Sequence, residues 1–276
     1  MPSFWDNLKI TTHLGDLANF CYNASMQDKT YLYGTNSLYE ALASVPKAIR
    51  KVWIVNTNRD DELKKLVRSH SIALQTATSE DIRRLVGEVV HQGIVADIDT
   101  RMMMTTLNDA PSLQNPDANT CVVILDEITD PHNMGAIIRS AAGFGASAVI
   151  FPAHNQVQVT GAVIKASAGM VFHMPLIQVT NVNATIRTLK ERGFWIYGLD
   201  MAGQNPLHKE KFTTPVAFVV GNEGLGVHTK TMEHCDVKLS IPMHSTTESL
   251  NASVSAAVCL YEWYSQHPYG FSQPQS

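Results

Sequence analysis

Residues 216–226 read Val-Ala-Phe-Val-Val-Gly-Asn-Glu-Gly-Leu-Gly. The apolar residues at the start are typical of a strand that is buried on both faces of a parallel sheet. The glycines that follow allow the backbone to turn sharply and to approach a ligand closely. Taken alone, glycines in this position more often form a structural turn than a binding loop, but Glu223 gains nothing from such a turn. The stretch is therefore a candidate binding loop at the carboxyl edge of a parallel sheet.

Strands and helices alternate around this loop. Apolar runs predict strands at residues 121–125, 148–151, 194–199 and 216–220, and helical periodicity predicts helices at 133–144, 161–168, 182–192 and 247–264. This alternation predicts an α/β fold with a parallel sheet. A smaller α/β unit precedes it, with predicted strands at 52–55 and 93–96. Its predicted helices lie at 36–44, from Asp60 onward and from Ser79 onward, and Ser79 is expected to cap the third.

The composition suggests four segments. Residues 1–30 show weak patterns and are expected to form an N-terminal arm, and residues 31–101 the small α/β domain. Residues 102–120 contain two prolines without sustained periodicity, which indicates a linker. Residues 121–276 form the second α/β domain.

Bulk properties exclude several classes of protein. At 276 residues, 45% hydrophobic and 17% charged, the chain has an ordinary globular composition. We find no apolar run of the roughly 20 residues that a membrane helix needs, and no secretory signal. The cysteines form no C-x-x-C pair, and the histidines His132, His173 and His244 lack metal-ligand spacing. We therefore expect a cytoplasmic protein without a membrane span, disulfide scaffold or metal site.

The formal net charge of −4 does not itself suggest a nucleic-acid partner, because phosphate contacts require lysine and arginine. If RNA binds, local patches or a dimer surface must carry the contacts.

Three loops follow predicted strands and are candidates for chemistry: residues 126–135, 221–226 and 241–251. The second lacks the Lys-Ser/Thr of a phosphate-binding P-loop and does not match the dinucleotide pattern. Arg139, on the helix after the first loop, could be a surface arginine. Asn133 could cap that helix, and Ser249 and Asn251 could cap the last one.

Together these loops resemble the three sequence motifs of the SpoU/TrmH family of RNA 2′-O-methyltransferases. The first motif corresponds to Asp-Pro-His-Asn-Met-Gly-Ala at 130–136 with Arg139, and the second to residues 219–226. The third corresponds to Ile-Pro-Met at 241–243 and Ser-Leu-Asn-Ala-Ser-Val at 249–254. The similarity continues through Lys-Ala-Ser-Ala-Gly at 165–169.

The N-terminal half, at residues 33–42 and 91–96, resembles the auxiliary substrate-binding domain of the RlmB branch, the bacterial 23S rRNA guanosine 2′-O-methyltransferases. The resemblance then covers residues 31–265. Residues 244–248, His-Ser-Thr-Thr-Glu, depart from the Gly/Ser-rich approach usual in the third motif, and residues 1–30 have no counterpart. The alternatives are a tRNA or another rRNA site as substrate, or a non-catalytic RNA-binding ribosome-assembly factor.

The resemblance implies a deep trefoil knot in the C-terminal domain and a homodimer acting on RNA. It implies that S-adenosylmethionine is held by Gly221, Ile241 and Leu250, with Asn222 and Gly226 beside them. Arg139 would activate the ribose hydroxyl, with the orienting residues Asn133, Glu223, Ser249 and Asn251. Because arginine is a poor base, positioning and phosphate binding are the physically sounder roles for Arg139.

Overall fold

The computed structural model describes residues 29–222, 224–244 and 249–267. The expected arm at residues 1–30 lies outside these ranges except for its last two positions, and Glu223 lies outside them too. The expected start of the last helix at Thr247 is wrong: residues 249–251 are not helical, and the helix begins at Ala252, because Asn251 is its N-cap. None of the helices in the described ranges combines the length and apolar character needed to cross a bilayer.

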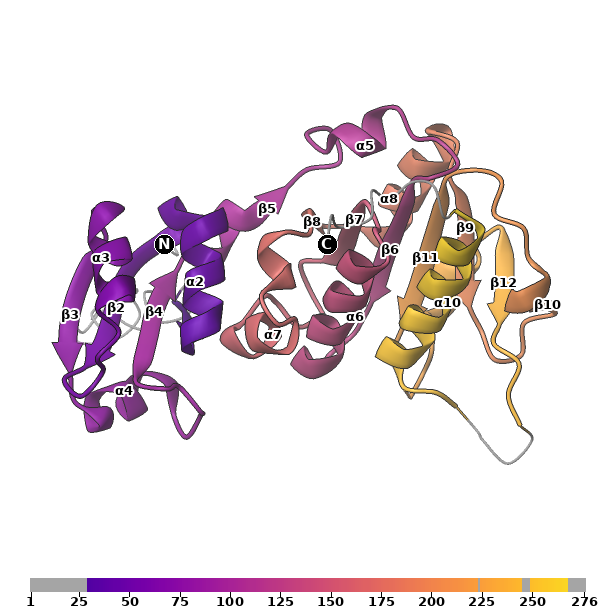
Figure 1. The fold of residues 1–276 in the computed structure, drawn as a ribbon. Helices are drawn as coiled ribbons and strands as arrows, with labels where there is room; N and C mark the ends of the chain where they lie inside the picture. The colour runs from indigo at the N-terminus through magenta and orange to yellow at the C-terminus, as the bar shows by residue number, and fades with distance from the viewer. Residues whose placement is uncertain (1–28, 223, 245–248, 268–276) are drawn as a thin grey trace, which may run out of the picture.

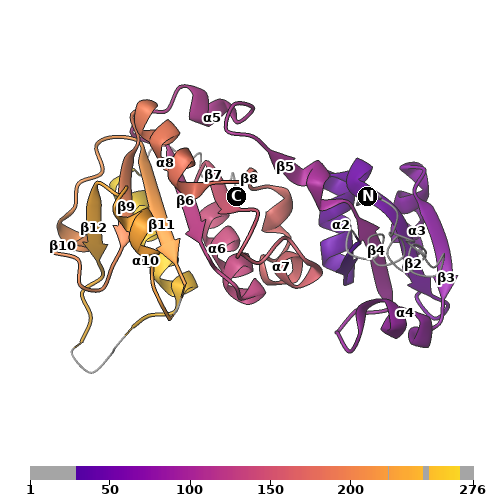
Figure 2. The ribbon, with the colours of Figure 1, turned by 180° about the vertical axis from the view of Figure 1, so that it is seen from behind.

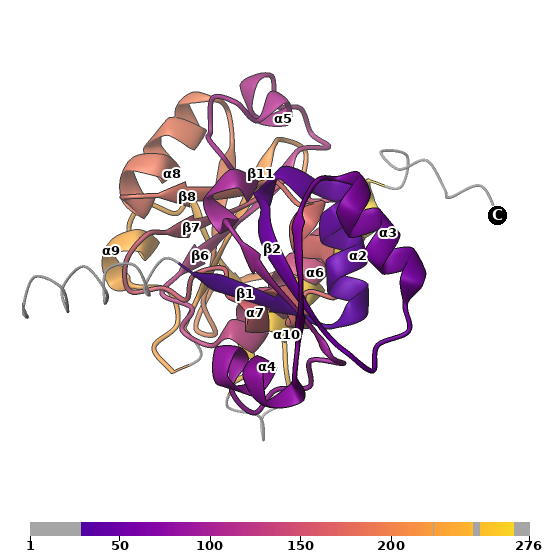
Figure 3. The same cartoon turned by 90° about the vertical axis from the view of Figure 1, so that its left-hand side faces the viewer.

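The N-terminal unit is a four-stranded mixed sheet with helices on both faces (Figure 1). The strand order is β1 (Thr30–Tyr33), β4 (Ile94–Ile98), β2 (Ile49–Val55), β3 (Ala73–Ala77), in which only the β2–β3 pair is parallel. One face packs on α2 (Thr35–Ser44) and α3 (Asp61–Ser69), and the other on α4 (Ser79–Val86). Figure 3 shows α2 and α3 on one side of these strands.

Local hydrogen bonds set the starts of these helices. Asp60 caps α3, because its Oδ1 accepts from the Leu63 N–H at 2.9 Å. In α4 the predicted cap, Ser79, is wrong: Thr78 is the N-cap, and Ser79 is the first helical residue. Thr78 prevails because it forms a reciprocal capping box with Asp81, which satisfies two backbone N–H groups at once.

The C-terminal unit contains an eight-stranded sheet in which every neighbouring pair is parallel. Its strands, in spatial order, are β10 (Asn205–Pro206), β12 (Val237–Ser240), β9 (Trp195–Leu199), β11 (Val216–Gly221), β6 (Cys121–Asp126), β7 (Ala148–Pro152), β8 (Leu176–Val179) and β5 (Met104–Thr105). The predicted parallel α/β fold is confirmed.

Helices cover both faces of this sheet. Figure 1 shows α6 (Pro131–Gly143), α7 (Gly161–Ala166) and α10 (Ala252–Gln266) in front of it, and Figure 2 shows α8 (Val182–Glu191) on the opposite face. Side chains alternate accordingly: in β6, Val123 and Leu125 join the core under α6 and α10, and Val122 and Ile124 join the core under α8. Burial on both faces explains the continuous apolar runs. The remaining helices are short: α5 (Pro111–Gln114), α9 (Thr229–Met232) and the 3₁₀ turns η1 (Pro46–Ala48), η2 (Thr100–Met103), η3 (Met170–Phe172) and η4 (Leu207–Lys209).

The expected linker, residues 102–120, has more structure than its composition indicates. Met104 and Thr105 form β5, which pairs with β8 at the edge of the large sheet. Ala110, the N-cap of α5, and Leu113, within α5, are buried. The segment thus packs on the C-terminal unit. The exact domain boundaries stay a prediction, as does the trefoil knot, because part of the third loop lies outside the described residues.

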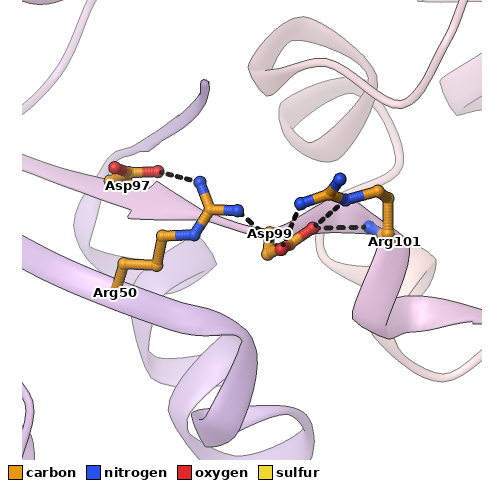
Figure 4. A network of polar contacts seen from close by, with 4 residues as sticks. All are labelled: Arg50, Asp97, Asp99 and Arg101. Atoms are coloured by element: carbon orange, nitrogen blue, oxygen red, sulfur yellow. Dashed lines mark hydrogen bonds and ion pairs between the residues drawn. The ribbon is translucent and has the colours of Figure 1, made fainter. Parts of the chain in front are cut away.

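A charged network holds the chain where it leaves the small unit (Figure 4). Asp99 Oδ2 accepts from Arg50 Nη2 at 2.5 Å and from Arg101 Nη2 at 2.9 Å, and Arg50 Nη1 lies 3.5 Å from Asp97. Asp99 also caps η2, and its N–H donates to the Ala48 carbonyl at 2.8 Å. The hydrogen bonds from Arg101 and Arg50 hold the pKa of Asp99 well below its usual range.

We expect Asp99→Asn to lower the free energy of unfolding by about 1 kcal/mol at pH 7, because it removes a charged acceptor that two arginines share while the site stays partly solvated. A carboxylate whose folded pKa is depressed stabilises the protein above its unfolded pKa, 3.8, and this contribution declines as pH falls toward the folded value. The difference between wild type and variant in urea denaturation should therefore shrink below about pH 4. Glu88→Gln, in a more exposed ion pair, is the control. A difference that is independent of pH would contradict this role of Asp99.

Candidate functional site

A cavity of about 520 Å³ lies at the carboxyl edge of the large sheet. Its walls come from the segments after β9, β11 and β12, from α9 and from the start of α10. The cavity is lined by all the residues predicted to bind a cofactor, Gly221, Asn222, Gly226, Ile241 and Leu250, and also by Ser249. Segments far apart in sequence therefore meet where parallel α/β sheets place their ligands.

The glycines of the 221–226 loop serve different purposes. A Cβ atom on Gly221 would lie 2.1 Å from the carbonyl carbon of Gly226 and 2.2 Å from the Val227 nitrogen, so the loop closes directly against this position. Gly226 has φ of +70°, a conformation that favours glycine. Gly224 has neither constraint, because its nearest neighbour would be Asn222 Oδ1 at 3.6 Å. Position 221 therefore requires glycine because the backbone of residues 226 and 227 approaches it closely, whereas position 226 favours glycine because of its positive φ.

Asn222 joins the first and second loops. Its Nδ2 donates to the Glu127 carbonyl at 3.1 Å, and its Oδ1 accepts from the Gly224 N–H at 2.9 Å. Its own carbonyl accepts from the Gly226 N–H at 2.8 Å. Glu127 adopts φ of +62°, which is uncommon for a residue other than glycine, and the bond from Asn222 fixes the peptide carbonyl there. Asn222 thus shapes the cavity wall.

Asp126, the last residue of β6, is a second anchor that the sequence patterns do not single out. Its buried carboxylate accepts from the His228 N–H at 2.9 Å, which holds the segment that follows Gly226. Burial raises the pKa of Asp126, and the hydrogen bonds from His228 and Thr231 oppose this shift. The signal available in sequence is an acid directly after an apolar strand.

Asn133 and Asn251 meet although they are far apart in sequence: Asn251 Nδ2 donates to Asn133 Oδ1 at 2.9 Å. The capping interpretation of Asn133 is wrong, because Asp130 is the N-cap of α6 and Asn133 is buried in its first turn. The capping interpretation of Asn251 is confirmed, since its Oδ1 accepts from the Ser253 N–H at 2.9 Å. This pair ties the first turns of α6 and α10 together.

Arg139 lies outside the cavity. Its side chain is exposed on α6 and does not line the cavity. No hydrogen bond or ion pair involves its guanidinium among the residues that the structure describes. Near it, between α6 and α10, lies a shallow groove lined by Ala136, Ser140, Ser253, Val254, Ala257, Val258 and Tyr261, in which Val254 is 46% and Tyr261 59% exposed. The structure therefore assembles the predicted cofactor residues and the two asparagines but leaves Arg139 on an open face.

The cavity also contains residues that sequence reasoning missed. Asp200 and Met201 follow β9, Glu233 follows α9, and Lys238 belongs to β12. The end of the predicted strand at 194–199 was a usable signal for Asp200 and Met201. The alternation of apolar and polar residues in Val-Lys-Leu-Ser-Ile at 237–241 was likewise a usable signal for β12 and for Lys238.

Two family models match this chain. Residues 120–261 match the SpoU rRNA Methylase family, and residues 31–103 match the RNA 2′-O ribose methyltransferase substrate binding family. The two matched regions correspond to the large parallel sheet and to the small mixed sheet.

Similar proteins support these matches. The chain is 36% identical to RlmB, the 23S rRNA (guanosine-2′-O-)-methyltransferase of Pectobacterium atrosepticum, over 84% of this chain and 96% of that protein. It is 34% identical to an uncharacterized tRNA/rRNA methyltransferase of Synechocystis, over 88% of this chain, and spans only 64% of that relative's length. The crystal structure of the SpoU methyltransferase AviRb from Streptomyces viridochromogenes, in complex with AdoMet, superposes with a TM-score of 0.76 at 22% identity, over 90% of this chain and 94% of that one. This last likeness shows the fold.

Proposed function

This chain belongs to the SpoU family of RNA 2′-O-methyltransferases, and we propose that it methylates the ribose 2′-hydroxyl of a guanosine in 23S rRNA, using S-adenosylmethionine. The observation that carries the proposal is the cavity in which the loops of all three motifs meet or are tied together. An rRNA substrate would place the protein in the cytoplasm with the ribosome.

The cavity suits S-adenosylmethionine in size and chemistry. Its volume of about 520 Å³ lies within the ordinary range for pockets that bind small molecules. Its wall combines apolar side chains, such as Ile241 and Leu250, with the backbone of Gly221 and Gly226 and with the acids Asp200 and Glu233. Backbone groups can hydrogen-bond the adenine and ribose, and acids can attract the positively charged end of the molecule. When bound, S-adenosylmethionine supplies an electrophilic methyl group.

The remaining site residues would act on the ribose. A 2′-hydroxyl is a weak nucleophile: as its oxygen takes the methyl group, the displaced sulfur would leave as a neutral thioether, and the hydroxyl proton would pass to the adjacent RNA phosphate or to water. We assign to Arg139 the binding of the adjacent RNA phosphate through its planar guanidinium, which orients the ribose and stabilises the developing negative charge. Asn133 and Asn251 would hold the start of α6 in register with the cavity. Ser249 lines the cavity and can contact the ribose. Glu223, which lies outside the described residues, is included in this proposal from its motif alone.

A homodimer fits this arrangement. The groove between α6 and α10 exposes Val254 and Tyr261 beside Arg139's helix, and a second copy packed there would bury them. We propose that dimerisation brings Arg139 and a cofactor cavity together, since Arg139 does not line the cavity of its own chain. Light scattering tests this step: a monomer at micromolar concentration under assay conditions contradicts it.

The substrate is tested by methyl transfer from labelled S-adenosylmethionine to purified unmethylated RNAs. We expect label in 23S rRNA, at a guanosine ribose when mapped by resistance to alkaline cleavage, and none in tRNA. The matched control is the Arg139→Ala protein. Label in tRNA alone would contradict the 23S rRNA assignment. Absence of label from every RNA, with S-adenosylmethionine bound in calorimetry, would instead favour a non-catalytic RNA-binding protein.

A further inference from the structure

A second cavity, of about 290 Å³, lies where the small unit meets the methyltransferase unit. The small unit contributes Tyr33, Gln92 and the first turn of α2, and the methyltransferase unit contributes Lys165 from α7. Neither the cofactor cavity nor the groove beside Arg139 includes any of these residues.

The two units are in close contact around this cavity. Gly161, at the start of α7, approaches β1 so closely that a Cβ there would lie 2.1 Å from the Tyr31 carbonyl oxygen. His173 Nε2 and Glu40 Oε2 lie 2.8 Å apart, so they join the units at a second point. The cavity is therefore a defined feature of the junction, lined by side chains whose positions both units fix.

Lys165 is the charged group in this cavity. Its side chain is exposed, its Nζ lies 5.5 Å above the centre of the Tyr33 ring, and it donates to the Val90 carbonyl at 3.3 Å. No carboxylate pairs with it among the described residues. By contrast, Arg50, Arg83 and Arg101 of the small unit each form ion pairs. An ammonium group makes three donor contacts, so Lys165 can still bind an anion.

The rest of the wall is also suited to an anion. Gln92 Oε1 accepts from the Thr35 N–H at 2.9 Å, which fixes the chain at the start of α2. The Asn36 and Ser37 N–H groups that follow have no acceptor among the described residues, and both residues line the cavity. The Tyr33 ring offers an aromatic surface at the same place, and Val90, 70% exposed, an apolar one.

We propose that this junction is a nucleotide subsite, in which a phosphate of the substrate RNA binds Lys165 and the adjoining sugar or base packs on Tyr33 and Val90. The proposal rests on the proposed function, since an RNA held by the small unit must cross this junction to reach the methyltransferase unit. The junction thereby couples RNA binding by the small unit to placement of the target ribose.

The test measures binding of a 23S rRNA transcript to the full-length protein at several salt concentrations. Lys165→Ala should raise the Kd about tenfold at 0.1 M salt, because one charge-assisted contact is lost. It should also lower the slope of log K against log salt by about one, the value for a single phosphate. Lys165→Arg should retain both values. Lys65→Ala, an equal loss of charge on α3, at the side of the small unit away from α7 (Figure 1), should change neither.

A second control separates phosphate binding from docking of the two units. Glu40→Ala removes the other tie between them and leaves the cavity's cation in place. If Glu40→Ala lowers RNA affinity as much as Lys165→Ala does, or if Lys165→Ala matches wild type in Kd and slope, the subsite is wrong. Because wild-type methyl transfer is measured alongside, a failure of the proposed function appears separately, as absence of methylation by the wild-type protein.

Discussion

Arg139→Ala should reduce kcat for methyl transfer to RNA by about 10²- to 10³-fold, the usual loss when one donor that stabilises developing charge is removed. The Kd for S-adenosylmethionine should stay unchanged, because Arg139 does not line the cofactor cavity. Stability should also change little, since the side chain is exposed and forms no hydrogen bond or ion pair among the described residues. Tritium transfer at saturating RNA, calorimetry with the cofactor and thermal unfolding measure the three quantities.

Two variants sharpen this test. Arg187→Ala removes an exposed arginine from α8, on the opposite face of the sheet, and should retain wild-type activity. Arg139→Lys keeps the charge but loses the planar pair of donors, so it should recover only part of the rate. Near-wild-type transfer by Arg139→Ala, with normal cofactor binding, would remove Arg139 from the mechanism.

Sequence patterns predict the long, strongly apolar elements of this fold well. The strand at residues 121–125 and the helices α6 and α8 appear within one or two residues of the expected ends. β3 was not predicted, because Ala-Leu-Gln-Thr-Ala has neither sustained alternation nor a continuous apolar run. Sheet pairing, which no local pattern encodes, makes it a strand. β12 was missed although Val-Lys-Leu-Ser-Ile at 237–241 alternates apolar and polar residues, which is the pattern of a half-buried strand.

The candidate site also has some features that the sequence predicts and others that it does not. The 221–226 loop is visible in sequence because three glycines within six residues, directly after an apolar strand, form a local pattern. The bond between Asn133 and Asn251 is not, since it joins residues 118 positions apart and each alone suggests a helix cap. Asp126 escapes notice for a similar reason: its partner, the His228 N–H, belongs to another loop. Contacts between loops depend on the assembled sheet.

Gly221→Ala should raise the Kd for S-adenosylmethionine about 100-fold and lower the free energy of unfolding by about 1–3 kcal/mol. The added methyl group would overlap the backbone of Gly226 and Val227, which cannot move aside as a flexible side chain can. The loop must therefore shift by about 1 Å or more, and Asn222 and Gly226, which line the cavity, shift with it. Calorimetry with the cofactor and urea denaturation measure both effects.

Gly224→Ala is the matched control for this change. It adds the same methyl group to the same loop, but its nearest described neighbour would be Asn222 Oδ1 at 3.6 Å, an ordinary contact, so binding and stability should stay close to wild type. Gly226→Ala should fall between the two, because a Cβ there meets no atom within 4 Å and costs only the strain of a positive φ. Equal effects at Gly221 and Gly224 would show that general loop flexibility, and not the contact between Gly221 and Gly226, shapes the cofactor cavity.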